Sequence, residues 1–149
     1  MGRNDWSSLN SLQIGRYAEY FLKMEFTMFG FDVYTAEVDD RGIDFVIRRN
    51  ATRYFDVQVK SSRNMNYIFF PKNSFDLREN LLAGVVLFRD GNVPQCYLIP
   101  ATTWEQSNAL FVSRDYLGKK SKPEYGLNLS QRNMPLLTQY AFDRIVQQL

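Results

Sequence analysis

Three short stretches of the sequence carry residue types that together could hold a metal ion beside a phosphate. Residues 42–44 (Gly-Ile-Asp) begin one expected strand with Asp44, and residues 55–60 (Phe-Asp-Val-Gln-Val-Lys) place Lys60 on the next strand. Residues 15–19 lie upstream on a long helical stretch, where Glu19 supplies a second carboxylate. Carboxylates bind hard divalent cations, and a lysine beside such a cation can orient or deprotonate an attacking water. These residues are the strongest functional signal in the sequence.

The rest of the composition limits the chemistry to these kinds of group. The sequence contains no histidine and a single cysteine, Cys96. Disulfides, zinc sites and Ser-His-Asp triads are therefore excluded, and any catalysis must use carboxylates, lysine, hydroxyl groups or a hard metal ion. Cys96 lies in an expected strand, and we interpret it as a buried small hydrophobic residue.

Charge is distributed unevenly around these residues, although the net charge of the whole chain is only +2. Residues 37–44 hold four acids against one arginine, and residues 48–72 hold six basic residues against one acid. An acidic cluster beside a basic surface suits a metal site that receives a phosphate backbone. Two solvated faces of opposite charge are the alternative that composition leaves open.

The chain of 149 residues has the size of one domain, and 45% of its residues are hydrophobic. We therefore expect residues 1–149 to form a single domain. The longest apolar run, residues 81–88, is far shorter than the ~20 residues of a membrane-spanning helix. The first residues lack the apolar core of a signal peptide, so we expect a cytoplasmic protein with no membrane association.

The hydrophobic pattern predicts the elements that must position the candidate residues. Apolar residues at helical spacing predict a helix over residues 9–29, closed by Gly30. Alternating apolar residues predict three strands in succession: 31–37, 43–49 and 54–61. A turn at residues 39–42 joins the first two strands, so the candidate residues belong to one helix and one three-stranded meander.

Shorter elements are expected after this meander. Apolar runs between turn signals predict three more strands: 67–70, 83–88 and 95–99. The expected helical segments are a turn or short helix at 73–80, a short helix capped by Thr102 or Thr103 that ends at Ser107, and a final helix at 135–149. Residues 119–125 are expected to form a basic loop.

Each of the three motifs has a simpler interpretation when it is taken alone. The Asp-Val-Gln-Val-Lys segment has the pattern of any half-buried strand whose outer face is polar. Glu19 precedes Lys23 by four residues, which is the favoured orientation of an exposed helical ion pair. Residues 42–44 could form a hairpin turn that leads into a strand with an exposed aspartate.

The order and spacing of the three motifs resemble the PD-(D/E)XK nuclease superfamily, which has the restriction-endonuclease-like fold. A helical Glu is followed by an Asp after Gly-Ile on the second strand and by Gln-Val-Lys on the third. The resemblance covers residues 14–62 by motif and residues 73–100 by topology. It implies a single α/β nuclease-like domain with an αβββαβ core, a central mixed sheet flanked by helices, and an extra C-terminal helix.

The resemblance implies catalytic roles for four residues: Glu19, Asp44, Gln58 and Lys60. Gln58 departs from the family pattern, because most members have Asp or Glu there, although Gln is an accepted variant. Glu19, Asp44 and Gln58 would hold Mg²⁺, with Mn²⁺ as its substitute. Lys60 would orient or deprotonate the attacking water. Because Gln is neutral, two carboxylates remain to balance one divalent ion, and Asp56 on the same strand is expected to pair with an arginine.

These inferences predict a metal-dependent endonuclease that hydrolyses phosphodiester bonds in DNA. The basic residues expected to contact DNA phosphates are Arg41, Arg48, Arg53, Arg63 and Lys72. The alternative is a catalytically inactive nucleic-acid-binding or interaction module with the same fold, which the neutral Gln58 keeps open. A small-molecule hydrolase is disfavoured, because the chain has no recognisable nucleophile–base pair. DNA is the expected partner, and both a homodimer and a larger DNA-processing complex are compatible with the resemblance.

Overall fold

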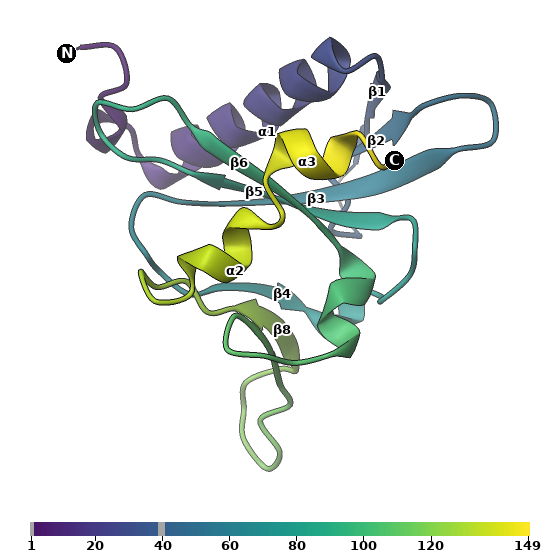
Figure 1. Cartoon of the computed structure of the whole chain (residues 1–149). Coiled ribbons are helices and arrows are strands. Elements are labelled where there is room, and N and C mark those ends of the chain that lie inside the picture. Colours follow the sequence, from purple (N-terminus) through teal and green to yellow (C-terminus); the bar gives the residue numbers. More distant parts are fainter. Residues whose placement is uncertain (1, 39–40) are drawn as a thin grey trace.

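The computed structural model describes residues 2–38 and 41–149 as two β-sheets with helices packed around them (Figure 1). The larger sheet has the strand order β1-β2-β3-β5-β6. Its strands are β1 (Asp32–Thr35), β2 (Phe45–Arg48), β3 (Tyr54–Ser62), β5 (Leu81–Leu87) and β6 (Gln95–Pro100). β3 and β5 are parallel, and the other neighbours are antiparallel. The predicted α/β fold with a central mixed sheet flanked by helices is confirmed. Asp39 and Asp40 of the predicted turn lie outside the described residues.

The helix α1 (Ser11–Met28) covers one face of the larger sheet. At its start, Asn10 Oδ1 accepts from the Gln13 backbone N–H, and Gln13 Oε1 accepts from the Asn10 N–H. This reciprocal capping satisfies N–H groups that have no partner inside the helix. The buried residues of α1 recur at helical spacing, as predicted: Ile14, Ala18, Leu22 and Phe26. Among the described residues, no helix combines the length and apolar character needed to cross a bilayer.

A small antiparallel sheet covers the opposite face of the larger sheet (Figure 1). Its order is β4-β8-β7, and its strands are β4 (Ile68–Pro71), β7 (Phe111–Arg114) and β8 (Glu124–Leu127). Phe70, Phe75 and Trp104 are buried between the two sheets. The sequence pattern does not predict β7, and the predicted loop at 119–125 is wrong at Glu124 and Tyr125, the first two residues of β8. Neither strand shows a clear alternation, because β7 ends in the exposed Ser113 and Arg114, and β8 contains the buried Glu124 and Gly126.

The helical turn or short helix predicted at residues 73–80 is borne out only as one turn, in the crossover that joins β3 to β5. The structure has the single 3₁₀ turn η2 (Lys72–Ser74), and residues 75–80 continue without a helix. Phe75 is fully buried and Leu77 packs against the same core. A spacing of two residues is that of an extended chain, since a helix would place these side chains on different faces. β4 and η2 therefore take the place of the second helix of the predicted core.

The C-terminal segment forms two short helices instead of the single helix predicted at residues 135–149. These are α2 (Met134–Thr138) and α3 (Phe142–Val146). The chain breaks between them because Tyr140 O accepts from the Leu98 backbone N–H at 2.8 Å and Ala141 forms a bridge with Tyr97.

Two further 3₁₀ turns complete the described structure. The first is η1 (Trp6–Ser8), which precedes α1. The second is η3 (Ala101–Glu105), which stands where the sequence predicts a short helix capped by Thr102 or Thr103. That capping prediction is wrong, because η3 begins directly after Pro100 and has no side-chain cap.

Gly84 of β5 lies directly beneath α1. A Cβ at this position would lie 2.6 Å from Leu22 Cδ1 and 3.5 Å from Val57 Cγ1. We expect Gly84→Ala to lower the free energy of unfolding by about 1–3 kcal/mol, because extra atoms in a packed core force side chains and backbone to shift. The decrease in the free energy of unfolding is measured by urea unfolding, with an unchanged m value.

The control is Gly15→Ala in α1, where nothing lies within 4 Å of the added Cβ. That change should raise stability by roughly 0.5–1 kcal/mol, since Ala is the better helix former. Equal losses in both variants would contradict the packing of α1 on β5.

Cys96 of β6 is partly buried and packs against the core on the α1 side. Burial, reinforced by the carboxylates of Glu25 and Asp143, raises the pKa of this thiol to about 12. The thiolate is the reactive form, so a thiol reagent at pH 8 should modify the native protein roughly a thousandfold more slowly than the unfolded protein. Absorbance of the released thiol chromophore in buffer and in urea gives both rates. Rapid reaction of the native protein would contradict the burial of Cys96.

Candidate active site

Asp44 lies at the point where β2 begins, and β3 holds its carboxylate in place. The β2–β3 ladder starts with Phe45 opposite Val57. Asp44 donates its backbone N–H to Val57 O at 2.9 Å, and its Oδ2 accepts from the Val59 backbone N–H at 2.7 Å. The carboxylate thus provides a hydrogen-bond acceptor for a β3 N–H group that lies past the end of the β2–β3 ladder. Its orientation is therefore set by the backbone of the neighbouring strand.

Gln58 and Lys60 point to the face of the larger sheet that lies opposite α1. Their neighbours Val57 and Val59 belong to the core on the α1 side, and side chains alternate along a strand. Gln58 is only 6% exposed, and no described residue hydrogen-bonds its Oε1. A buried polar atom without a partner costs about 1–3 kcal/mol. Oε1 of Gln58 is therefore suited to an additional ligand.

Asp44, Gln58 and Lys60 line one open depression of about 410 Å³. The loop residues that complete its lining are Gly42, Asn73 and Ser74. Gly42 has a φ of +75°, and a Cβ there would lie 3.2 Å from both Gln58 Nε2 and Ser74 Cβ. Glycine therefore permits the loop before β2 to approach Gln58 closely. No sequence motif marks Asn73 and Ser74, which reach the depression only because the β3–β5 crossover returns beneath the sheet.

Glu19 is not among the residues that line the depression. It lies on α1, with its side chain 26% exposed and its Oε2 4.0 Å from Arg16 Nη1. One turn later, Lys23 Nζ lies 5.6 Å from the centre of the ring of Phe45, the first residue of β2. The flank of α1 that carries Glu19 thus runs beside the beginning of β2, near Asp44 but on the other side of the sheet. The structure brings three of the four predicted residues together and leaves Glu19 outside.

Asp56 is engaged in an ion pair next to the depression. Its Oδ2 lies 2.6 Å from Arg78 Nη2, which confirms the predicted pairing with an arginine. Asp56 lines an adjoining depression and does not line the one shared by Asp44 and Lys60. A third negative charge at the candidate site therefore does not come from Asp56.

The residues present suit a single hard cation that is held only in part by the protein. The Asp44 carboxylate and Gln58 Oε1 are oxygen donors on adjacent strands, and oxygen is the ligand type that Mg²⁺ and Mn²⁺ prefer. Within the described part of the chain, no three His, Cys, Asp or Glu side chains gather as a metal-binding group. This donor set fits an ion that takes most of its ligands from water and from a substrate phosphate.

Two of the five basic residues predicted to contact DNA lie near the depression. Arg41 lines the adjoining depression, which shares Asn73 and Ser74 with the candidate site. Lys72 comes directly before Asn73, but its Nζ is bound to Asp115 Oδ1 at 2.7 Å. Lys72 therefore joins η2 to the segment after β7, and Arg41 is the better placed of the two for a phosphate contact.

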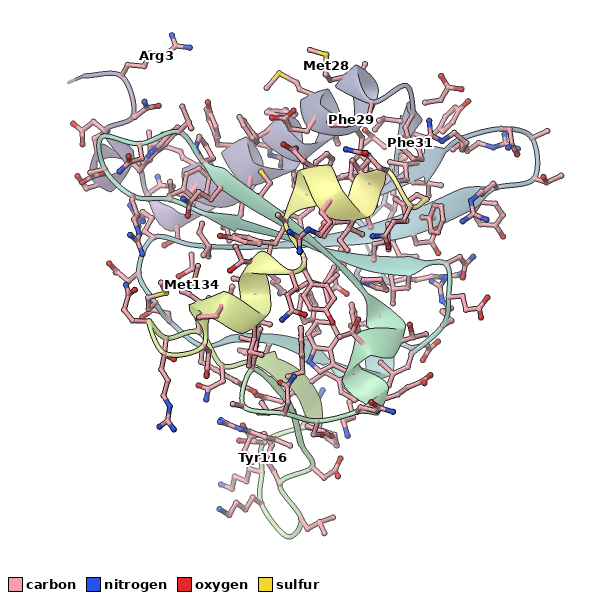
Figure 2. The ribbon with its side chains drawn as sticks, in the orientation of Figure 1. Arg3, Met28, Phe29, Phe31, Tyr116 and Met134 are labelled. Atoms are coloured by element: carbon pink, nitrogen blue, oxygen red, sulfur yellow. The ribbon has the colours of Figure 1, made fainter. Side chains whose placement is uncertain are left out.

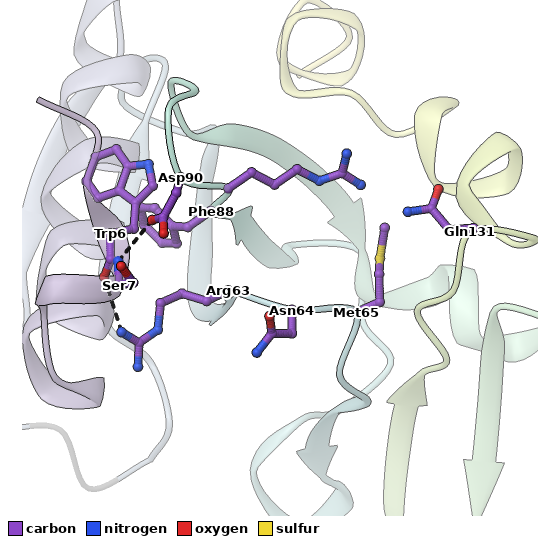
Figure 3. Close-up of a pocket in the computed structure, with 9 residues that line it drawn as sticks. Trp6, Ser7, Arg63, Asn64, Met65, Phe88, Asp90 and Gln131 are labelled. Atoms are coloured by element: carbon purple, nitrogen blue, oxygen red, sulfur yellow. Dashed lines mark hydrogen bonds between the residues drawn. The ribbon is translucent and has the colours of Figure 1, made fainter.

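The other three basic residues lie at the β2–β3 turn and at the far end of β3. Arg48 and Arg53 flank the β2–β3 turn, where Arg48 Nη2 donates to a main-chain carbonyl at 2.8 Å. Arg63 follows the far end of β3, beside a cavity of about 540 Å³ (Figure 3). Its Nη1 donates to the backbone carbonyls of Trp6 and Leu9. Arg63 thus fastens η1 to the end of β3, a structural role that the sequence does not reveal.

Comparison with known proteins finds a structural relative at low sequence identity. No protein-family model matches the sequence, and no curated protein matches it. The fold is similar to that of Hjc, a Holliday junction resolvase from the archaeal hyperthermophile Archaeoglobus fulgidus, with a TM-score of 0.56. The match covers 89% of this chain and 95% of that chain at 14% sequence identity. At this identity the similarity establishes a shared fold, and function must be argued from the site.

Gln58→Met tests whether Oε1 lacks a partner within the protein. Methionine fills a similar volume without an atom that requires a hydrogen bond, so the desolvation cost of the buried amide disappears. We expect the free energy of unfolding to rise by about 1 kcal/mol when urea unfolding is followed in EDTA. Gln95→Met, at an exposed position of β6, is the matched control and should change stability by less than about 0.5 kcal/mol. A clear loss of stability at Gln58 would mean that Oε1 is already hydrogen-bonded.

Proposed function

We propose that the protein is a metal-dependent endonuclease that hydrolyses phosphodiester bonds in DNA. The observation that carries the proposal is the arrangement of Asp44, Gln58 and Lys60 around one depression, with Gln58 Oε1 buried and without a partner among the described residues. The fold shared with a Holliday junction resolvase of Archaeoglobus fulgidus supports it by analogy.

Each residue of the depression has a role that its position supports. Asp44 and Gln58 Oε1 would hold Mg²⁺, or Mn²⁺ in its place. The bound ion would polarise the phosphate and lower the pKa of its water. Lys60, held on a strand, would orient the attacking water and offset the negative charge that develops on the phosphate. Glu19 does not line this depression, so we assign it no direct contact with the ion.

The charges in the depression determine how the ion would bind. Asp44 contributes a carboxylate and Lys60 an ammonium group, so the described lining attracts a divalent ion only weakly. DNA adds phosphate oxygens, which are ligands that Mg²⁺ commonly takes from a substrate. We therefore infer that metal and DNA bind cooperatively, each weakly alone and more tightly together.

A nucleic-acid-binding or interaction module without catalysis is the second candidate. The neutral Gln58 and the position of Glu19 outside the depression favour it, because both reduce the charge available for a metal ion. DNA is the proposed partner of the endonuclease and of the nucleic-acid-binding module. Cutting both strands of a duplex requires two sites, so the endonuclease proposal includes a homodimer or a larger DNA-processing complex. A DNA partner and a single free cysteine are consistent with a cytoplasmic location.

Substitution of Lys60 and Asp44 separates catalysis from binding. With supercoiled, linear and branched DNA in Mg²⁺ or Mn²⁺, Lys60→Ala should lower the cleavage rate by about 100-fold or more. Its DNA affinity should fall only by the modest amount expected for the loss of one charge. On duplex DNA, the slope of log K against log salt concentration should decrease in magnitude by about 0.9. Asp44→Asn should abolish cleavage together with metal binding. Arg144→Ala, which removes an exposed charge from α3, is the control and should cleave normally.

Gln58→Glu distinguishes the two candidate functions. The added carboxylate should tighten Mg²⁺ binding, which is measured as a rise in melting temperature with ion concentration. An ion at 100 times its Kd adds about 2.7 kcal/mol to the folded state. If the wild type cuts none of the DNA substrates and Gln58→Glu neither binds metal nor cuts, the endonuclease proposal fails and the binding module is adopted.

A further inference from the structure

The outer face of the small sheet carries residues that the proposed active site does not use. The strand register places Phe69 of β4, Gly126 of β8 and Val112 of β7 in one row across this sheet. The row toward the β7–β8 connection pairs Arg114 with Glu124. Because side chains alternate along a strand, both rows face away from the core that the intervening residues bury.

Tyr67 lies flat over the middle of this outer face because Gly126 has no side chain. Any Cβ at Gly126 would collide with the Tyr67 ring. Tyr67 Oη donates to Glu124 Oε2 at 2.5 Å, which satisfies a carboxylate that is only 8% exposed. Burial and this carboxylate raise the pKa of Tyr67 well above its ordinary value, so the phenol remains a donor at neutral pH. The ring is therefore held in one orientation.

Phe69 and Arg114 extend the Tyr67 ring into a solvent-facing surface, which we name the aromatic platform. The Phe69 ring centre lies 6.3 Å from that of Tyr67, with an angle of 19° between the ring planes. The Arg114 guanidinium lies 4.3 Å from the centre of the Tyr67 ring. Phe69 is 47% exposed, and Arg114 is exposed. Aromatic rings and guanidinium planes that are open to solvent are surfaces on which unpaired nucleic-acid bases stack.

A basic loop adjoins the aromatic platform. The connection between β7 and β8, residues 115–123, projects from the body of the molecule (Figure 1), and Tyr116 lies on it (Figure 2). Its exposed lysines are Lys119, Lys120 and Lys122. Tyr116 adopts a φ of +53°, and its carbonyl accepts from the Lys119 backbone N–H at 2.9 Å, which forms a turn. The ion pair of Lys72 with Asp115 anchors the base of the loop. The lysines are thus presented next to the platform.

We propose that the aromatic platform and the basic loop together bind single-stranded DNA. An unpaired base stacks on Phe69 beside the Arg114 guanidinium, and the loop lysines contact the flanking phosphates. The bases of a duplex are already stacked on one another, so the platform selects unpaired strands. The choice of DNA over RNA rests on the proposed function, whereas the binding itself needs neither the metal nor the active-site residues.

Fluorescence anisotropy with a labelled oligodeoxythymidylate of about 15 nucleotides, in EDTA, tests this proposal without cleavage. Phe69→Ala should weaken binding about tenfold, in line with the loss of one base-stacking contact, and Phe69→Tyr should retain the affinity. An abasic strand of the same length isolates the stacking contribution. The wild type should bind the abasic strand more weakly, and Phe69→Ala should weaken that binding no further.

Tyr54→Ala is the matched control. Tyr54 of β3 has the same exposed fraction as Phe69, 47%, and also lies among arginines, because Arg48 is its partner in β2. This variant should bind the oligonucleotide like the wild type. Replacement of the three loop lysines by glutamine should lower the salt slope by about 0.7 for each lost contact, on the thymidylate and abasic strands alike. Thermal melting of each variant confirms that it folds.

Several results would overturn the proposal: an unchanged affinity in Phe69→Ala, an equal loss in Tyr54→Ala, equal wild-type affinity for the thymidylate and abasic strands, or tighter binding of a duplex. Tighter binding of an oligouridylate would overturn the assignment to DNA. Asp44→Asn should bind the single strand like the wild type. The two proposals can therefore fail separately. If the protein binds single-stranded DNA on the platform but cuts nothing, only the endonuclease proposal is contradicted.

Discussion

The parallel pairing of β3 with β5 determines how the rest of the chain is arranged. The two strands pair from Asp56 opposite Leu81 to Ser62 opposite Leu87. Parallel neighbours cannot be joined by a tight turn, so the intervening chain must cross from one end of the sheet to the other along one face. This crossover supplies β4 to the small sheet and brings Asn73 and Ser74 beneath Gln58. The hydrophobic core between the two sheets and one side of the depression both follow from this pairing.

The candidate site combines side chains that differ in how firmly the fold positions them. Asp44 is held by a backbone N–H of β3, and Gln58 and Lys60 are carried on that same strand. Their relative positions therefore depend only on the geometry of two adjacent strands. Glu19 belongs to a different layer of the molecule, and its position relative to Asp44 depends on how α1 packs on the sheet. Strand register, which places Gln58 and Lys60 beside Asp44, therefore does not place Glu19 there.

Segments with a clear hydrophobic period could be predicted from the sequence, and segments without one could not. The spacing of Ile14, Ala18 and Leu22 identifies α1, and the alternation along β3 places Gln58 and Lys60 on one face. Neither pattern indicates which face of the sheet α1 covers, so the position of Glu19 relative to Asp44 could not be derived. β7 and β8 lack a recognisable period, because β7 ends in two exposed polar residues and β8 contains a buried Glu and a Gly. The break between α2 and α3 depends on a hydrogen bond to distant β6. The depression was therefore predictable from its strands but not from its loops.

The contact of Arg63 with η1 has a consequence for sequence variation. Its guanidinium binds the main-chain carbonyl of Trp6 (Figure 3) and that of Leu9, and these acceptors are present whatever side chains the segment carries. Residues 7 and 8 are exposed, so most replacements there would leave this attachment intact. A proline that reshapes the backbone would disturb it even without altering a charge. At this corner of the molecule, the tolerance to mutation is set by backbone shape rather than by chemical identity.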